Sequence, residues 1–294
     1  MWHSILVLAL ALSTPPAAGG PFVRPVTVPL RLAGHLPIVR VMVDGAGPFD
    51  FALDTGATIS LIDPRLAREG SLVSAGTVPV VSVGGSRPAP RVRVARIAVG
   101  AADLGAAAPL VLDLASLRAL DRRIAGVLGQ DLLSRTNMLV DYRARTVTFD
   151  PSGALARELR GTRVPFEFAD GRPVVEVQAD TGRTLRLALD SAAEVCMLFE
   201  RAPGLLARLR LGHWRPWSIE TYLGKTPAAV GELVPLRIGS TRLTGIAGAM
   251  MAADRGERRL EEGLLPLSLF DAVYFDNEGR GIVIVEEGGA RDRR

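Results

Sequence analysis

The stretch Phe51-Ala-Leu-Asp54-Thr-Gly-Ala-Thr58 governs the interpretation of this sequence. It places a carboxylate at the end of an apolar segment, directly before a hydroxyl residue and a glycine. The stretch Leu187-Ala-Leu-Asp190-Ser-Ala-Ala-Glu194 repeats this setting. Because removing a charge from water is costly, a carboxylate that emerges from a buried strand needs a structural or chemical reason.

Both stretches belong to a long internal repeat. Residues 28–62 align without a gap with residues 164–198 at a constant offset of 136, and 11 of these 35 positions are identical. A second block, residues 126–133, aligns with residues 263–270 at an offset of 137. Repeated segments of this kind indicate repeated structural units. We therefore predict two similar lobes, at residues 20–155 and 156–294, the second ending in a short arginine-rich tail.

Each lobe is expected to be mostly β-sheet. Alternating or continuous apolar residues predict strands at residues 26–32, 38–43, 49–53, 78–83, 91–99 and 141–149, the last interrupted by a turn. Asp63-Pro64 is typical of the start of a helix, with aspartate as the cap and proline in the first turn. The expected fold is mainly β, with two pseudo-symmetric, closed-barrel-like lobes and a few short helices.

Composition excludes several classes of protein. The chain has 294 residues, 48% of them hydrophobic and 22% charged, which is unlike a disordered chain. Of the 35 basic residues all but Lys225 are arginine, and they are scattered among 31 acidic residues with 5% aromatics. A nucleic-acid-binding protein would show a denser basic stripe. The single cysteine, Cys196, excludes an intrachain disulfide and any cysteine-based metal site, and is expected to pack as a small apolar residue.

The N-terminus has the pattern of a secretory signal peptide over residues 1–19. Residues 5–12 form an unbroken apolar run, which Pro15-Pro16 and small residues at 17–20 follow. The run is shorter than the roughly 20 residues that a membrane-spanning helix requires. No cysteine lies near the cleavage site to carry a lipid anchor. We expect a periplasmic or secreted protein with no stable membrane insertion after cleavage.

The repeat supplies a reason for two buried carboxylates. If the lobes pack about a pseudo-two-fold axis, the strand ends that carry Asp54 and Asp190 meet at the interface. Two carboxylates within hydrogen-bond reach share a proton, which raises one apparent pKa and lowers the other. Such a pair offers a base for a water molecule and an acid for a carbonyl oxygen, and it hydrolyses a peptide bond without a metal or a covalent intermediate.

On residues 51–58 and 126–133 the sequence resembles the aspartic peptidases, and specifically the retropepsin-like bacterial members, joined in one chain as pepsin-like enzymes are. The resemblance implies that Asp54 and Asp190 are catalytic, with no metal, no cofactor and a peptide or protein as substrate. It implies that the hydroxyls of Thr55 and Ser191 bond across the lobe interface.

The same resemblance assigns further supporting residues. The backbone N–H groups of Gly56 and Ala192 would donate to the carboxylates. The hairpin at Gly84-Gly85 resembles the flap that closes over substrate, with Leu223-Gly224 as its counterpart in the second lobe.

The second lobe departs from the family pattern at two positions, and this leaves alternatives open. Ala192 stands where the first lobe has Gly56, and Pro266 where it has Gly129. The favoured interpretation is an exported, monomeric aspartic endopeptidase. One alternative is a non-catalytic peptide-binding protein with a degenerate second lobe. The other is a homodimer that pairs two copies of Asp54.

The remaining polar and aromatic residues are expected to be structural. His35 and His213 lack a partner in any catalytic motif, and Trp214 and Trp217 are expected to staple a loop rather than line a cleft. Turn positions are predicted for Asp44, Asp141, Asp180 and Asp276, and surface or capping positions for Asp103, Asp113 and Asp131.

Overall fold

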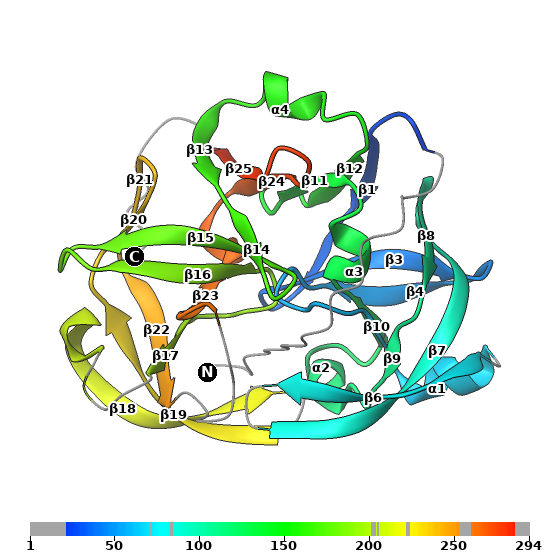
Figure 1. The fold of residues 1–294 in the computed structure, drawn as a ribbon, viewed down its shortest axis with the longest axis horizontal. Helices are drawn as coiled ribbons and strands as arrows, with labels where there is room; N and C mark the ends of the chain where they lie inside the picture. Colours follow the sequence, from blue (N-terminus) through cyan, green and yellow to red (C-terminus); the bar gives the residue numbers. More distant parts are fainter. Residues whose placement is uncertain are drawn as a thin grey trace.

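The computed structural model describes residues 22–70, 72–82, 85–200, 204, 206–221, 224–252 and 260–285. The fold is mainly β, as predicted: each half of the chain forms one large sheet, and a third sheet joins the halves (Figure 1). The signal peptide predicted at residues 1–19 lies outside the described residues. Within the described part, no helix is long and apolar enough to span a membrane.

The first lobe is built on a nine-stranded sheet. Its strands, in spatial order, are β2 (Arg31–Ala33), β3 (Leu36–Val43), β4 (Ala46–Leu53), β10 (Ile124–Leu128), β5 (Leu61–Ile62), β9 (Leu110–Val111), β7 (Gly85–Val99) and β6 (Val73–Ser82), with β8 (Ala102–Ala107) paired to β7. β4 and β10 run parallel, with Leu53 opposite Leu128. That pairing places the end of β4, and therefore Asp54, next to residues 126–133, the second block of the internal repeat.

The second lobe repeats this plan with a ten-stranded sheet. Its strands, in spatial order, are β18 (Arg210–Thr221), β19 (Gly224–Leu233), β22 (Ile246–Ala252), β17 (Cys196–Glu200), β23 (Gly263–Pro266), β16 (Thr184–Asp190), β15 (Arg172–Ala179), β20 (Leu236–Ile238) and β21 (Thr241–Leu243), with β14 (Glu167–Ala169) paired to β15. β16 and β23 run parallel, with Asp190 opposite Pro266. Asp190 therefore ends its strand as Asp54 does.

A six-stranded sheet takes strands from both halves of the chain. Its order is β1 (Val26–Pro29), β12 (Thr146–Asp150), β11 (Asn137–Asp141), β24 (Ala272–Asp276), β25 (Gly281–Val285) and β13 (Gly161–Pro165). At its centre β11 of the first half pairs with β24 of the second. This sheet lies at the top of Figure 1, above the two lobes.

Short helices fill the connections. They are α1 (Pro64–Glu69), α2 (Ala115–Leu120), α3 (Gln130–Leu133) and α4 (Leu155–Glu158), with 3₁₀ turns at Ala207–Leu209 and Leu267–Leu269. Asp63 caps α1 by accepting a hydrogen bond from the N–H of Arg65, so the helix start predicted at Asp63-Pro64 is correct. α4 lies across the predicted lobe boundary at 155/156, and that boundary stays a prediction.

One segment that was predicted to be a single strand is two strands. Residues 26–32 form two strands in different sheets, β1 in the shared sheet and β2 in the first lobe. The chain changes sheet at Leu30, whose N–H donates to the carbonyl of Arg145 at 2.8 Å and whose side chain is buried. Period-two alternation continues through this point, so the pattern alone does not reveal the change of partner.

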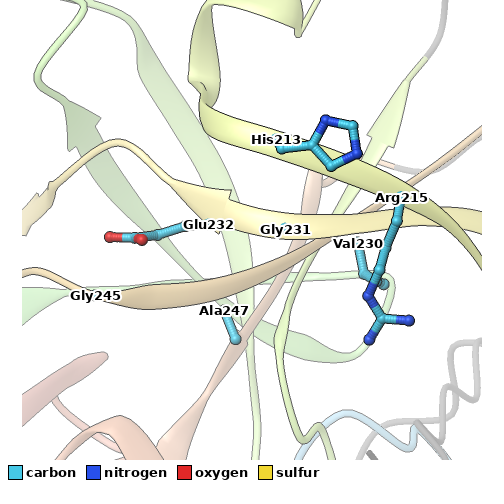
Figure 2. Close-up of a pocket in the computed structure, with 7 residues that line it drawn as sticks. All are labelled: His213, Arg215, Val230, Gly231, Glu232, Gly245 and Ala247. Carbon is cyan, nitrogen blue, oxygen red and sulfur yellow. The ribbon is translucent and has the colours of Figure 1, made fainter. Parts of the chain in front are cut away.

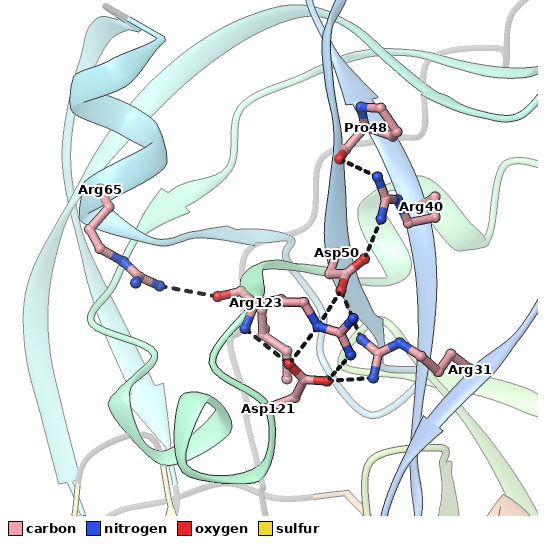
Figure 3. A network of polar contacts seen from close by, with 8 residues as sticks. Arg31, Arg40, Pro48, Asp50, Arg65, Asp121 and Arg123 are labelled. Atoms are coloured by element: carbon pink, nitrogen blue, oxygen red, sulfur yellow. Dashed lines mark hydrogen bonds and ion pairs between the residues drawn. The ribbon is translucent and has the colours of Figure 1, made fainter.

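A network of arginines and aspartates secures the outer side of the first lobe (Figure 3). Asp50 on β4 is 4% exposed and forms ion pairs with Arg31, Arg40 and Arg123. Asp121 pairs with Arg31 and Arg123. Hydrogen bonds from Arg123 hold the pKa of Asp121 well below its ordinary value. The scattered arginines of the sequence are thus partly paired with neighbouring carboxylates.

Candidate active site

Asp54 occupies the loop that follows β4 and is 1% exposed. Its N–H donates to the carbonyl of Leu128 at 3.0 Å, which extends the parallel pairing of β4 and β10 into the loop. Its Oδ1 accepts hydrogen bonds from the N–H groups of Gly56 at 2.8 Å and Ala57 at 3.0 Å. Two backbone donors therefore fix the orientation of this carboxyl group.

Asp190 has the same surroundings at the end of β16 and is also 1% exposed. Its Oδ1 accepts hydrogen bonds from the N–H groups of Ala192 at 2.7 Å and Ala193 at 3.0 Å. Replacing glycine by alanine at position 192 thus keeps the donor. The two loops present their carboxyl groups in equivalent ways.

The two carboxyl groups meet at the lobe interface. A Cβ atom placed on Gly56 would lie 2.4 Å from Oδ2 of Asp190, so only glycine fits at position 56. Burial raises the pKa of Asp190 to about 6, against hydrogen bonds from Ala192 and Ala193, the charge of Arg172 and a hydrogen bond with Asp54, which all lower it. Asp54 and Asp190, far apart in sequence, form one coupled pair.

The residues that follow the two aspartates lock the lobes together. The hydroxyl of Thr55 donates to the carbonyl of Leu189 at 2.8 Å and accepts from the N–H of Ser191 at 3.0 Å. Reciprocally, the hydroxyl of Ser191 donates to the carbonyl of Leu53 at 2.6 Å and accepts from the N–H of Thr55 at 2.9 Å. We call these four buried hydrogen bonds the interlobe latch. They hold the two aspartate loops face to face.

A second set of hydrogen bonds supports the loop that carries Asp54. The N–H of Gly129 donates to the hydroxyl of Ser60 at 3.0 Å, and this hydroxyl donates to Oδ1 of Asp131 at 2.6 Å. Gln130 donates its side-chain N–H to the carbonyl of Thr55 at 2.9 Å. The prediction that Asp131 is a surface or capping residue is therefore wrong: burial raises its pKa, and its carboxylate braces the loop.

In the second lobe, three of the residues that support the loop are replaced together. By the repeat, Ser60, Gly129 and Asp131 correspond to Cys196, Pro266 and Ser268. Proline removes the N–H donor at the same time as cysteine replaces the hydroxyl that would accept from it, so no donor is left unsatisfied. Cys196 is fully buried on β17, as predicted. The departure at Pro266 is thus matched by its neighbours.

Ala192 is also accommodated. Its methyl group is fully buried and packs in a cluster of the first lobe that includes Leu36, Ile38, Ala52 and Val127. The added methyl group therefore contributes apolar contact across the interface, where the equivalent group on Gly56 would collide with a carboxyl group. The two halves of the site are equivalent in hydrogen bonding and different in packing.

Two long hairpins correspond to the predicted flaps. β6 and β7 pair from Val73 to the hairpin end, where Ser82 faces Gly85, and β18 and β19 end with Thr221 facing Gly224. Gly84 and Leu223 lie outside the described residues, while Gly85 and Gly224 begin β7 and β19. In Figure 1 both hairpins run along the lower edge of the view, each as part of its lobe.

The tryptophan prediction needs correction, because both residues lie on a strand. Trp214 and Trp217 belong to β18, not to a loop. The ring of Trp214 covers Gly231 on β19 and Gly248 on β22, where a Cβ atom would approach it to 2.7 and 3.0 Å. Trp217 is 38% exposed and lies beneath the guanidinium of Arg215. Trp214 therefore staples strands together.

A hollow of about 290 Å³ on β18, β19 and β22 is separate from the aspartates (Figure 2). His213, Arg215 and Glu232 line it, but Arg215 and Glu232 point in different directions. His213 therefore lies in a hollow that neither Asp54 nor Asp190 lines. Among the described residues, no group of three or more histidine, cysteine, aspartate or glutamate side chains could hold a metal ion.

The aspartates predicted to be structural lie in turns or near the ends of strands and helices. Asp44 accepts from the N–H of Arg96, Asp141 from that of Ala144, Asp276 from that of Gly279, Asp103 from that of Gly105 and Asp113 from that of Ala115, while Asp180 pairs with Arg242. His35 contacts the second loop, with Nε2 lying 2.8 Å from the carbonyl oxygen of Ala192. These residues position backbone and take no part in a separate site.

Two residues near the pair were not found from the sequence. Burial, and then the charges of Asp190 and Asp54, raises the pKa of Tyr142 at the end of β11. Arg172 begins β15 and is 1% exposed. The repeat contains a signal for Arg172, because an arginine there replaces Leu36 of the first copy. For Tyr142 the sequence offers only its place in a predicted turn.

Comparison with known proteins finds a family match in the first lobe. Residues 39–132 match the model of the aspartyl protease family. The match contains Asp54 and the block at residues 126–133 that braces it. No curated protein matches the sequence. Among solved structures, the chain is similar to the crystal structure of basic 7S globulin from soybean, with 10% identity, a TM-score of 0.47, and coverage of 90% of this chain and 97% of that chain.

Proposed function

We propose that this protein is an exported aspartic endopeptidase whose catalytic dyad is Asp54 and Asp190. The observation that carries the proposal is the pairing of two buried aspartates, one from each lobe, each oriented by two backbone N–H groups. The match of residues 39–132 to the aspartyl protease family supports hydrolase activity at the level of the family. Export to the periplasm or the medium is proposed from the leader pattern alone.

The geometry supports hydrolysis by an activated water. With one proton shared by the dyad, the ionised carboxylate removes a proton from water as the oxygen attacks the peptide carbonyl carbon. The protonated carboxyl group donates its proton to the carbonyl oxygen, which gives a neutral tetrahedral intermediate. The carboxyl group that took the proton from water then donates it to the amide nitrogen, and the other carboxylate accepts a proton from a hydroxyl of the intermediate as the C–N bond breaks. The dyad stays singly protonated, and its proton is again on the original carboxyl group.

Activity is expected to be highest below neutral pH. The dyad is competent only while it retains the shared proton, and Asp190 has a pKa of about 6 because of its burial. Raising the pH through this value removes the shared proton, so hydrolysis should decline above about pH 6. Because the proposed mechanism uses no metal, hydrolysis should also resist chelators. A chelator-sensitive enzyme, or one with its optimum well above neutrality, would contradict the assignment.

The decisive experiment compares digestion of a peptide library by four proteins at several acidic pH values. They are the mature wild type, Asp54→Asn, Asp190→Asn and the double variant, with Asp113→Asn as a control at an exposed aspartate. Each single variant should lose nearly all activity, and the double variant should be little worse, because residues that act as one unit are strongly non-additive. Undiminished turnover by Asp190→Asn would remove the second lobe from the mechanism.

The two alternatives receive less support. A non-catalytic peptide-binding protein was suggested by Ala192 and Pro266, but both residues fit their surroundings without disturbing the donors to Asp190. A homodimer that pairs two copies of Asp54 is disfavoured because the interlobe latch already holds the loop of Asp54 against the loop of Asp190 in the same chain. Size-exclusion chromatography of the mature protein should accordingly give a monomer.

A further inference from the structure

A buried ion pair without a counterpart in the first lobe lies beside the dyad. Nη2 of Arg172 is 2.9 Å from Oε1 of Glu261, and the two side chains are 1% and 0% exposed. Burying two charges carries a desolvation penalty that their attraction does not always recover. Nε and Nη1 of Arg172 have no hydrogen-bond partner among the described residues, so Glu261 satisfies this guanidinium only in part. Stability alone is therefore a weak reason for the pair.

Strand register places this arginine across from the catalytic carboxyl group. β15 and β16 are antiparallel, with Val174 opposite Ala188 and Val175 opposite Leu187. Continuing this register by two residues sets Arg172 opposite Asp190, and both side chains lie on the same face of the sheet because the period of a strand is two.

The first lobe has an apolar residue at the corresponding place. β3 and β4 pair with Ile38 opposite Ala52, which sets Leu36 opposite Asp54 by the same continuation. Leu36 is fully buried in the first-lobe cluster. Since both aspartates receive the same two backbone donors, the arginine is a difference in charge between the two halves of the dyad.

We propose that Arg172, held in place by Glu261, is a positioning residue whose guanidinium stabilises the negative charge of the Asp54–Asp190 pair. The proposal rests on the proposed function in treating this pair as the catalytic dyad. Arg172 acts through Asp190 and not on the substrate. Its consequence is that the dyad loses its shared proton at a lower pH than burial alone would set.

The electrostatic surroundings agree with this role. Burial raises the pKa of Asp190, and the charge of Arg172 opposes that rise. Other ionisable groups that face the dyad or its loops are Tyr142, which follows β11; His35, in the turn before β3, with Nε2 2.8 Å from the carbonyl oxygen of Ala192; Glu194, in the loop after Asp190; and Glu261, the partner of Arg172. Burial keeps Tyr142 neutral by raising its pKa. Among the charges that act on Asp190, that of Arg172 lowers its pKa.

The test titrates the dyad directly in the substrate-free protein, by NMR of ¹³C-carboxyl-labelled aspartate. Arg172→Met should raise the apparent pKa at which the dyad loses its shared proton by about 1 unit, because a cation is lost and the negative charge of Glu261 is no longer balanced by it. Glu261→Gln should lower it, because the guanidinium is no longer compensated. Shifts of opposite sign follow from charge and not from loosened packing. Arg183→Met is the matched control, since it removes an ion pair with the neighbouring Glu262 at 2.6 Å and should leave the titration unchanged.

The double variant Arg172→Met/Glu261→Gln guards against a failure to fold, because it leaves no unpaired buried charge. It should fold and titrate above wild type but below Arg172→Met. Shifts of the same sign in both single variants, or a titration identical to wild type in all of them, would overturn the proposal. The pH profile of peptide hydrolysis should move with the NMR values. If no peptide is cleaved while the titration shifts as expected, the proposed function fails and the role of Arg172 stands.

Discussion

Removing one hydroxyl of the interlobe latch should destabilise the whole protein. Thr55→Val preserves the shape of the side chain but leaves two buried backbone groups without partners, the carbonyl of Leu189 and the N–H of Ser191. Each unsatisfied buried group costs about 1–3 kcal/mol, so the expected loss is about 2–6 kcal/mol. Ser191→Ala leaves the carbonyl of Leu53 and the N–H of Thr55 unpaired, and the same loss is expected.

The measurement is urea unfolding with a parallel thermal scan. For a chain of this size the expected loss corresponds to a Tm lowered by about 3–10 °C. The double variant should be less destabilised than the sum of the two, by about 0.5–3 kcal/mol, because once one hydroxyl is removed the interface relaxes and water reaches the groups that the second hydroxyl served. Thr77→Val, at an exposed position of β6, is the control for the substitution itself.

The reasoning would be refuted by a Thr55→Val protein whose free energy of unfolding lies within 1 kcal/mol of wild type, a margin well below the cost of two orphaned buried groups. Strictly additive losses in the double variant would contradict the narrower claim that the four bonds act as a unit. The first result would mean that the shared six-stranded sheet holds the lobes together without help from the aspartate loops, and the second that each hydroxyl stabilises the interface independently.

Three further predictions concern the same site and the surface network. Gly56→Ala should retain the fold but reduce kcat/KM at least about 100-fold, because the new methyl group would lie 2.4 Å from Oδ2 of Asp190 and must displace it; a nearly normal rate would contradict this packing. Asp190→Asn should be more stable than wild type at neutral pH, by up to about 3 kcal/mol. Because the pKa of Asp190 is raised to about 6, the wild type loses stability as the pH rises from about 4 through 6. Urea unfolding at pH 4 and pH 7 should show this loss in the wild type and not in the variant. Asp121→Asn should lower the Tm at pH 6, and the difference from wild type should shrink as pH falls below about 4, because a depressed pKa gives stability that is lost on acidification; Asp180→Asn, from an exposed ion pair, should show no such trend.

The sequence by itself determined the class of fold and pointed to Asp54 and Asp190 as the two aspartates at the lobe interface. The repeat at an offset of 136 predicted two lobes, and the apolar segments before Asp54 and Asp190 predicted that both carboxylates end buried strands. The helix start at Asp63 and the burial of Cys196 were predicted correctly for a similar reason. Each depends on side-chain chemistry and on periodicity within about ten residues, which a linear sequence displays directly.

The tertiary structure alone decided which residues meet. The latch joins residues about 136 positions apart, and the change of sheet at Leu30 and the bracing role of Asp131 depend on partners far away along the chain. Arg172 is the clearest case: its type is visible in the sequence, but only the register of β15 and β16 places it opposite Asp190. Register and long-range pairing arise from how whole strands pack, and local spacing carries no record of the partner that a strand will find.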